Sequence, residues 1–156
     1  MHIPNKIISG GQTGADIGGL VGAKRAGIKT GGMAPRDYKT EAGNKPEELK
    51  AFGLISHPSP QYSVRTKENV KGSDATLILA TDPSSDGTAM TIQFCQDLKK
   101  PYLVANPFED CEGQIRAFIN ETRPSILNIA GNRESRSKGL AARTASLIAL
   151  LFKARQ

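Results

Sequence analysis

Short runs rich in apolar and β-branched residues alternate with stretches of helical period along this chain, and no other feature limits its fold as much. The six runs are Lys6–Ser9, Ile28–Thr30, Phe52–Ser56, Ala75–Ala80, Tyr102–Ala105 and Ser125–Ala130. Between most of them, apolar residues recur every three or four positions, as they do in amphipathic helices. Strands that alternate with helices form right-handed crossovers and a mostly parallel sheet covered on both faces. The sequence therefore predicts a doubly wound, three-layer α/β/α fold.

Length and composition fit one domain that spans residues 1–156. The chain has 38% hydrophobic and 23% charged residues, which is typical of a globular protein, and no repeat or linker divides it. Its longest apolar run, SLIALLF at 146–152, is far shorter than the ~20 residues that cross a bilayer. The first residues lack an export signal, and the two cysteines form no CxxC pair. We therefore expect a cytoplasmic protein without a membrane partner.

The glycine-rich segment KIISGGQTGADIGG, at 6–19, follows the first strand directly. Thr13 is placed to cap a helix, and glycines without Cβ atoms would let an anion approach the amides at the start of that helix. The alternative is that these glycines serve only a tight turn and close packing of helix on sheet. Ser9 interrupts the G-x-G-x-x-G pattern and no carboxylate follows the second strand, which disfavours a nicotinamide dinucleotide.

A second glycine turn, TDPSSDGTAMT at 81–91, follows the fourth predicted strand. Asp86, Gly87 and Thr88 begin the next helix there. In a sheet of the common order 3-2-1-4-5-6, the first and fourth strands are neighbours. That order would bring both glycine turns to one crevice at the carboxyl ends of the strands, where two helix N-termini would bind one anion.

A net charge of +6 favours an anionic partner of this kind. Arg36, Arg65 and Arg133 follow or adjoin predicted strand ends and are candidates for bidentate binding of phosphate, although each alone is equally well explained as a surface charge. Asn132 and Ser135 follow the last strand and can reach the same edge. The predicted anion-binding residues are Gly10, Gly11, Gln12, Thr13, Gly14, Arg36, Arg65, Asp86, Gly87, Thr88, Asn132, Arg133 and Ser135.

Metal, nucleic-acid and catalytic sites are not supported. His2 and His57 have no second ligand at metal-binding spacing. Cys95 is expected to be buried and Cys111 to be more exposed. The few aromatic residues, with no tryptophan, disfavour single-stranded nucleic acid, which is bound by stacking. The aspartates near the second glycine turn are better explained as turn residues than as a catalytic pair, so we assign no catalytic residue.

Ordered blocks along nearly the whole chain carry a resemblance to a known family. They are IISGGQTGAD, GGMAPRDYKTEAG, YSVRTKENVKGSDATLIL, DGTAMT, KPYLV and LNIAGNRESRSKG. This set resembles the family of putative molybdenum carriers, which is related to molybdenum-cofactor carrier proteins. Through them it is similar to the Rossmann-like nucleotide-binding proteins typified by the lysine-decarboxylase-like phosphoribohydrolases. The resemblance implies a Rossmann-like fold, molybdenum cofactor as cargo, and a homo-oligomer such as a dimer or tetramer.

The same comparison of motifs bears on catalysis. In the phosphoribohydrolases the second turn reads P-G-G-x-G-T-x-x-E, and its glutamate is the acid–base residue, whereas this chain has Thr91 at that position. A threonine cannot act as a carboxylate base. We therefore predict a carrier that binds a phosphate-bearing pterin or nucleotide-like ligand without turnover. The alternative is a nucleotide-processing hydrolase in which Asp82 or Asp86 replaces the glutamate.

Two further segments carry expectations. The long stretch Gly31–Glu48 lies between the second and third strands without a clear period, and loops of that length are usually functional. The last helix, predicted over Ser137–Lys153, ends in a very apolar run. We expect this helix to help bury a subunit interface.

Overall fold

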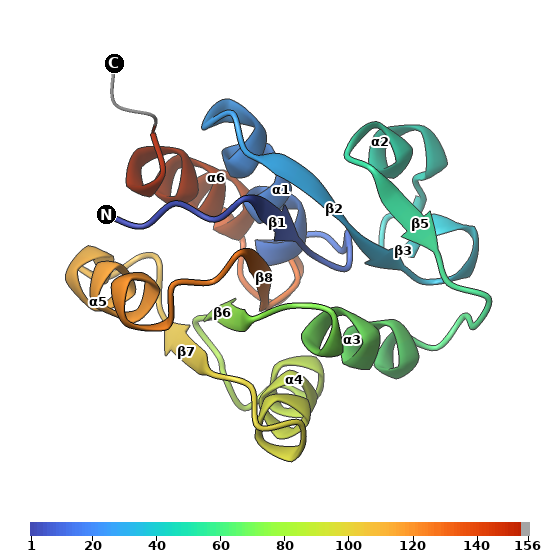
Figure 1. The fold of residues 1–156 in the computed structure, drawn as a ribbon. Coiled ribbons are helices and arrows are strands. Elements are labelled where there is room, and N and C mark those ends of the chain that lie inside the picture. Colours follow the sequence, from blue (N-terminus) through green and yellow to red (C-terminus); the bar gives the residue numbers. More distant parts are fainter. Residues whose placement is uncertain (154–156) are drawn as a thin grey trace.

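The computed structural model describes residues 1–153, and its centre is a six-stranded sheet (Figure 1). All five pairs of neighbouring strands are parallel. In sheet order the strands are β5 (Leu54–Ser56), β2 (Lys29–Ala34), β1 (Lys6–Ile8), β8 (Ile126–Gly131), β6 (Ala75–Leu79) and β7 (Tyr102–Ala105). The predicted parallel α/β architecture is confirmed, and each of the six predicted strands overlaps an observed one.

Helices cover both faces of this sheet. They are α1 (Ala15–Arg25), α2 (Pro46–Ala51), α3 (Tyr62–Lys71), α4 (Asp86–Asp97), α5 (Glu112–Thr122) and α6 (Leu140–Leu151). Figure 1 shows α1 and α6 together on one side of the central strands and α3 and α4 on the other. The main core lies between the sheet and the helices α1, α5 and α6, where Leu77, Ile115, Leu127, Ile129 and Ile148 are fully buried.

The predicted strand order 3-2-1-4-5-6 is wrong in one respect. The last strand, β8, lies between the first and fourth predicted strands, so that β1 and β6 are not neighbours. Leu127 is paired with Ile7 on one side and with Ala75 on the other. Periodicity identifies a buried strand but does not say which place it takes in a sheet, because every strand here is short and apolar. The two glycine turns therefore lie on either side of β8.

The segment predicted to be irregular, Gly31–Glu48, contains regular structure. Strand β2 continues to Ala34 and is followed by a 3-10 helix, η1 (Arg36–Tyr38). A small hairpin then pairs β3 (Lys39–Thr40) with β4 (Gly43–Asn44) in antiparallel fashion, and α2 begins at Pro46. Elements of two to six residues are too short to produce a detectable period, which explains why the sequence pattern did not predict them.

The last helix is shorter than predicted, and its apolar residues serve the chain's own core. Helix α6 packs closely against α1, where a Cβ atom on Gly22 would lie 2.7 Å from the carbonyl oxygen of Ala145. Leu147, Ile148 and Leu151 are buried, whereas Leu150 is 56% exposed. The subunit interface expected on this helix stays a prediction. Within residues 1–153 no helix has the length and apolarity that a membrane span needs.

Candidate functional site

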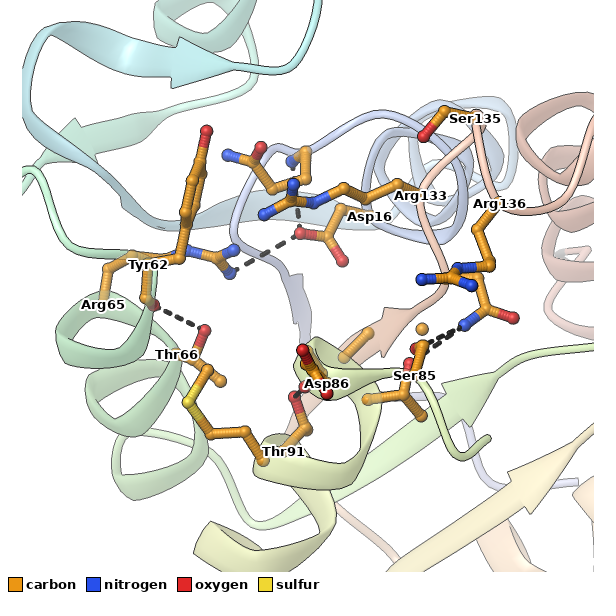
Figure 2. A pocket seen from close by; sticks show the side chains of 17 residues that line it. Asp16, Tyr62, Arg65, Thr66, Ser85, Asp86, Thr91, Arg133, Ser135 and Arg136 are labelled. Carbon is orange, nitrogen blue, oxygen red and sulfur yellow. Dashed lines mark hydrogen bonds and ion pairs between the residues drawn. The ribbon is translucent and has the colours of Figure 1, made fainter. Parts of the chain in front are cut away.

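A pocket of about 450 Å³ lies where β1, β8 and β6 end, and the first turns of α3 and α4 close its sides (Figure 2). Of the thirteen residues predicted to bind an anion, the structure brings eight to this pocket. They are Gln12, Arg65, Asp86, Gly87, Thr88, Asn132, Arg133 and Ser135. The other five residues predicted for this site do not line the pocket: Gly10, Gly11, Thr13, Gly14 and Arg36. Arg36 is exposed in η1, where its amide donates to the carbonyl of Ser59.

The first glycine turn does not present the bare amides that the sequence predicted. The amide of Gly11 donates to Ser9 Oγ at 3.2 Å, and that of Gln12 donates to Asp16 Oδ2 at 3.1 Å. The amide of Ala15 donates to the carbonyl of Asn132 at 3.1 Å. An internal carboxylate thus takes the place predicted for an external anion. This turn begins a helix, as predicted, but Asp16 already satisfies part of its hydrogen-bonding capacity.

Close packing explains two of the glycines in this turn. A Cβ atom on Gly10 would lie 1.7 Å from Nη1 of Arg65, so the guanidinium group occupies the space that a side chain would take. Gly14 has a φ of 82° and packs directly on the backbone of Asn132–Glu134. The alternative explanation given for the glycines, a tight turn with close packing, therefore accounts for these two positions.

Thr13 does not cap α1 as predicted, because the helix is preceded by Gly14 and has no side-chain cap. Thr13 instead donates its hydroxyl to Glu41 and accepts a hydrogen bond from the amide of Glu134 at 3.2 Å. Glu41 also accepts from the hydroxyl of Ser135 at 2.5 Å. This carboxylate therefore joins the β3–β4 hairpin to two loops at the rim of the pocket. Desolvation opposes its ionisation, but the hydrogen bonds from Ser135 and Thr13 outweigh it and lower the pKa of Glu41.

The second glycine turn differs from the first in leaving its amides open. Helix α4 begins at Asp86 after Ser85, and a Cβ atom added to Gly87 would have no neighbour within 4 Å. Within residues 1–153 no hydrogen-bond acceptor is paired with the amides of Asp86, Gly87 or Thr88. These groups line the pocket at the positive end of the helix dipole, which is an arrangement that favours a bound anion.

Asn132 holds the loop after β6 against the loop after β8, and its side chain has few free hydrogen-bonding groups left for a ligand. Its Oδ1 accepts from the amides of Thr81 and Asp82, each at 2.9 Å. Its Nδ2 donates to the hydroxyls of Ser85 at 3.0 Å and Thr88 at 3.1 Å. Because the residue is 2% exposed and bonded on both sides, it positions the start of α4 against the end of β8.

A buried ion pair forms one wall of the pocket. Nη1 of Arg65 lies 3.7 Å from Oδ2 of Asp16, and both side chains are about nine-tenths buried. Burial raises the pKa of Asp16 more than the charges of Arg65 and Arg133 lower it. Burial also lowers the pKa of Arg65 in spite of the attraction of Asp16. Burial thus disfavours the charged form of both residues, as is common for buried pairs.

Five charged or polar residues line this pocket without having been predicted from the sequence: Asp16, Tyr62, Thr66, Ser85 and Arg136. The ring of Tyr62 is covered by the guanidinium group of Arg133, whose central carbon lies 4.4 Å from the ring centroid. Arg136 lies 3.6 Å from Asp82. Arg136 lies among other basic residues in the sequence, with Arg133, Lys138 and Arg143, and only the fold shows that Arg133 and Arg136 line the pocket.

Potential metal ligands form no cluster in residues 1–153, and both cysteines are buried. Among residues 1–153 no group of three or more His, Cys, Asp or Glu side chains is arranged to hold a metal ion. Cys95 is buried as predicted, but Cys111, which was expected to be more exposed, is only 4% exposed. It precedes α5 and packs into the main core. Burial raises the pKa of both thiols.

Comparison with known proteins identifies the family. The model of the circularly permutated YpsA SLOG family matches residues 7–152. This chain belongs to that family. A solved structure described as a putative molybdenum carrier protein from Syntrophus aciditrophicus is 35% identical to the chain, with a TM-score of 0.89. The match covers 98% of this chain and 97% of that one. Among curated proteins, none matches.

A circular permutation agrees with the observed sheet. Numbered from β8 instead of β1, the strand order becomes 4-3-2-1-5-6, in which the first strand is central and the next three follow outward on one side. In the present chain that central strand comes last. The family resemblance expected from the sequence motifs, a molybdenum-carrier-like member of the Rossmann-like proteins, is thus confirmed.

Proposed function

We propose that this SLOG-family chain is a carrier that binds a phosphate-bearing pterin or nucleotide-like ligand without turnover, with molybdenum cofactor as its cargo. The observation that carries the proposal is the open N-terminus of α4, whose unpaired amides face the pocket together with Arg133 and Arg136. Backbone amides at a helix N-terminus and guanidinium groups are the usual protein ligands of phosphate. The name of the similar Syntrophus protein supports a molybdenum-related cargo.

The position of Thr91 supports binding without turnover. Thr91 lines the pocket where the phosphoribohydrolases have their glutamate, and its hydroxyl donates to the carbonyl of Gly87 at 3.0 Å. Unlike a carboxylate, a hydroxyl group at this position cannot act as the general base for water or as the general acid for a leaving group. Asp82 is already paired with Ser84 and Arg136, which lowers the pKa of its carboxyl. This leaves Asp82 a weak candidate for the acid of the alternative hydrolase.

Calorimetric titration and thermal unfolding test the binding claim. The probes are inorganic phosphate, GMP, AMP and neopterin monophosphate, and native mass spectrometry with elemental analysis tests whether the purified protein carries a pterin and molybdenum. A ligand at 100 times its Kd stabilises the fold by about 2.7 kcal/mol. Arg133→Met is expected to weaken phosphate-ester binding by about tenfold or more, since charge-assisted hydrogen bonds contribute about 1.5–3 kcal/mol.

Arg25→Met is the matched control, because it removes the same charge from an exposed position at the end of α1, outside the pocket. Equal weakening by both variants would indicate a general charge effect and would contradict the pocket assignment. Release of base or phosphate from the nucleotides at a rate that Arg133→Met lowers would favour the hydrolase instead.

A further inference from the structure

Asp16 is a buried pocket residue whose two carboxylate oxygens have different surroundings. Its side chain lies in the first turn of α1, and the residue is 5% exposed. Oδ2 accepts from the amide of Gln12 and faces Arg65. Within residues 1–153 no hydrogen-bond donor is paired with Oδ1, and Figure 2 shows this oxygen pointing toward the middle of the pocket. The carboxylate therefore has one oxygen committed to the fold and one turned toward any bound molecule.

Asp16 is largely buried, but its Oδ1 is open to the pocket, where water or a ligand can donate to it. Removing an ionised carboxylate from water carries a large desolvation penalty, which hydrogen bonds to its lone pairs offset. The fold supplies the amide of Gln12, which donates to Oδ2, and the amide of Gly10 also acts on the carboxylate and lowers its pKa. The raised pKa of this carboxyl, caused mainly by burial, agrees with incomplete compensation. A hydrogen-bond donor on a ligand would complete the set.

The neighbouring charges limit what this donor can be. Arg65 from α3 and Arg133 from the loop after β8 both act on the Asp16 carboxylate, and Arg136 and Asp86 line the same pocket. A metal cation at Oδ1 would be repelled by the guanidinium groups that already neutralise Asp16, and a phosphate there would be repelled by the carboxylate itself. A neutral N–H or O–H group avoids both penalties.

We propose that Asp16 Oδ1 accepts a hydrogen bond from a neutral N–H or O–H group of the ligand whose phosphate is bound at the start of α4. This inference rests on the proposed function and adds a specificity determinant to it. The donor can come from a ring, as in the 2-amino-4-oxopyrimidine edge that guanine and pterin share, or from a sugar hydroxyl. The pocket is thereby selective for a phosphate ester that carries such a donor over phosphate alone.

The test compares ligands on the wild-type protein by calorimetric titration. GMP and neopterin monophosphate carry both phosphate and donors, IMP lacks the 2-amino group, and dGMP lacks the 2′-hydroxyl. We expect the complete ligands to bind at least about tenfold more tightly than inorganic phosphate, because a hydrogen bond to a charged group contributes about 1.5–3 kcal/mol. Weaker binding of IMP identifies a ring donor, and weaker binding of dGMP identifies a sugar donor.

Asp16→Asn tests the residue itself. The asparagine oxygen can still accept from the amide of Gln12, which turns the Nδ2 donor toward the pocket in place of an acceptor. This variant is expected to lose about tenfold or more in affinity for GMP, to lose the difference between complete and donor-deficient ligands, and to keep its affinity for inorganic phosphate. Asp110→Asn, an exposed change outside the pocket, is the control.

The outcomes separate this inference from the proposed function. If no phosphate-bearing probe binds the wild-type protein, both fail. If the probes bind with equal affinity with or without donors, the role of Asp16 is overturned while phosphate binding stands. Should Asp16→Asn prove too unstable to purify, the wild-type comparison still overturns the inference if the ligand's donor groups make no difference to its affinity.

Discussion

At the scale of single residues, Gly10 shows how the pocket depends on an absent side chain. Gly10→Ala would place a Cβ atom 1.7 Å from Nη1 of Arg65, so the guanidinium group would have to move away from Asp16. Because breaking a buried pair leaves an unpaired ion, we expect the free energy of unfolding to fall by about 2–4 kcal/mol. Urea denaturation measures this loss.

Gly43→Ala serves for comparison. Gly43 lies in the hairpin with a φ of 102° and no atom within 4 Å of a Cβ position, so this change tests backbone strain without the displacement of a neighbour. We expect it to cost only about 1 kcal/mol, as strained conformations do. A Gly10→Ala variant no less stable than Gly43→Ala would contradict the role given to the Arg65 guanidinium group.

Glu41 gives a second prediction, which concerns pH. Its pKa is lowered in the folded protein, so its contribution to stability is complete above the pKa of the unfolded chain. That contribution is lost as the pH falls through the lower folded value. Glu41→Gln should therefore lower the free energy of unfolding by about 0.5–1 kcal/mol near neutral pH, given how exposed the residue is, and this difference should shrink as the pH falls below the ordinary glutamate pKa of about 4.3.

Urea denaturation of both proteins across this pH range measures the effect. Glu109→Gln, an exposed change after β7, controls for the loss of one negative charge. A difference between Glu41→Gln and the wild-type protein that persists unchanged at low pH would mean that the hydrogen bonds from Thr13 and Ser135 do not depend on the carboxylate's charge.

At the scale of elements, the contact between α1 and α6 sets the geometry behind the first glycine turn. Gly22→Ala would bring a Cβ atom within 2.7 Å of the Ala145 carbonyl and of Ile148 Cβ, neither of which is the end of a flexible chain. Overpacking of this kind costs about 1–3 kcal/mol, which exceeds the gain in helix propensity. Thermal and urea unfolding should therefore show a loss of stability.

Gly113→Ala provides the matched helical control. Gly113 lies in α5 with no atom within 4 Å of a Cβ position, so the gain in helix propensity should stabilise the protein by about 0.5–1 kcal/mol. Equal effects of the two substitutions would show that α1 and α6 move apart easily to accept a methyl group.

The elements also show what local pattern can predict. The six strands of the sheet and the start of α4 after a glycine turn follow from periodicity and turn chemistry. The hairpin at Lys39–Asn44 could not be predicted from local pattern. Its two-residue strands are held in place by tertiary contacts, such as the hydrogen bond from Gln12 Nε2 to the carbonyl of Lys39. The first and last helices, α1 and α6, were both expected from their periodicity, but their close mutual contact was not, since a glycine-rich contact face has little hydrophobic signal.

At the scale of the whole molecule, strand order was the main structural error. The sequence indicates which segments are strands, but the central place of β8 depends on competition among all parallel pairings, which local pattern does not contain. The consequence for the site is direct. Asn132, directly after β8, joins the two glycine turns: its carbonyl accepts from the amide of Ala15, and its side chain bonds to Asp82 and Ser85.

Assembly is the remaining prediction, and it belongs to the surface of the whole molecule. The buried side of α6 is used up by the chain's own core, which leaves Leu150 as the large apolar side chain that this helix exposes. If α6 helps form a subunit interface, Leu150 should lie near its centre, because an exposed leucine contributes most when it is desolvated there. Sedimentation at micromolar concentration should then show an oligomer, and Leu150→Glu should dissociate it.

Phe108→Glu distinguishes this surface from another, since Phe108 is 47% exposed in the loop between β7 and α5. Dissociation by Phe108→Glu but not by Leu150→Glu would move the interface to that loop, and a monomeric wild-type protein would remove the prediction altogether. Circular dichroism of each variant shows whether the fold is kept. Dissociation counts as loss of the interface only where the isolated subunit remains folded.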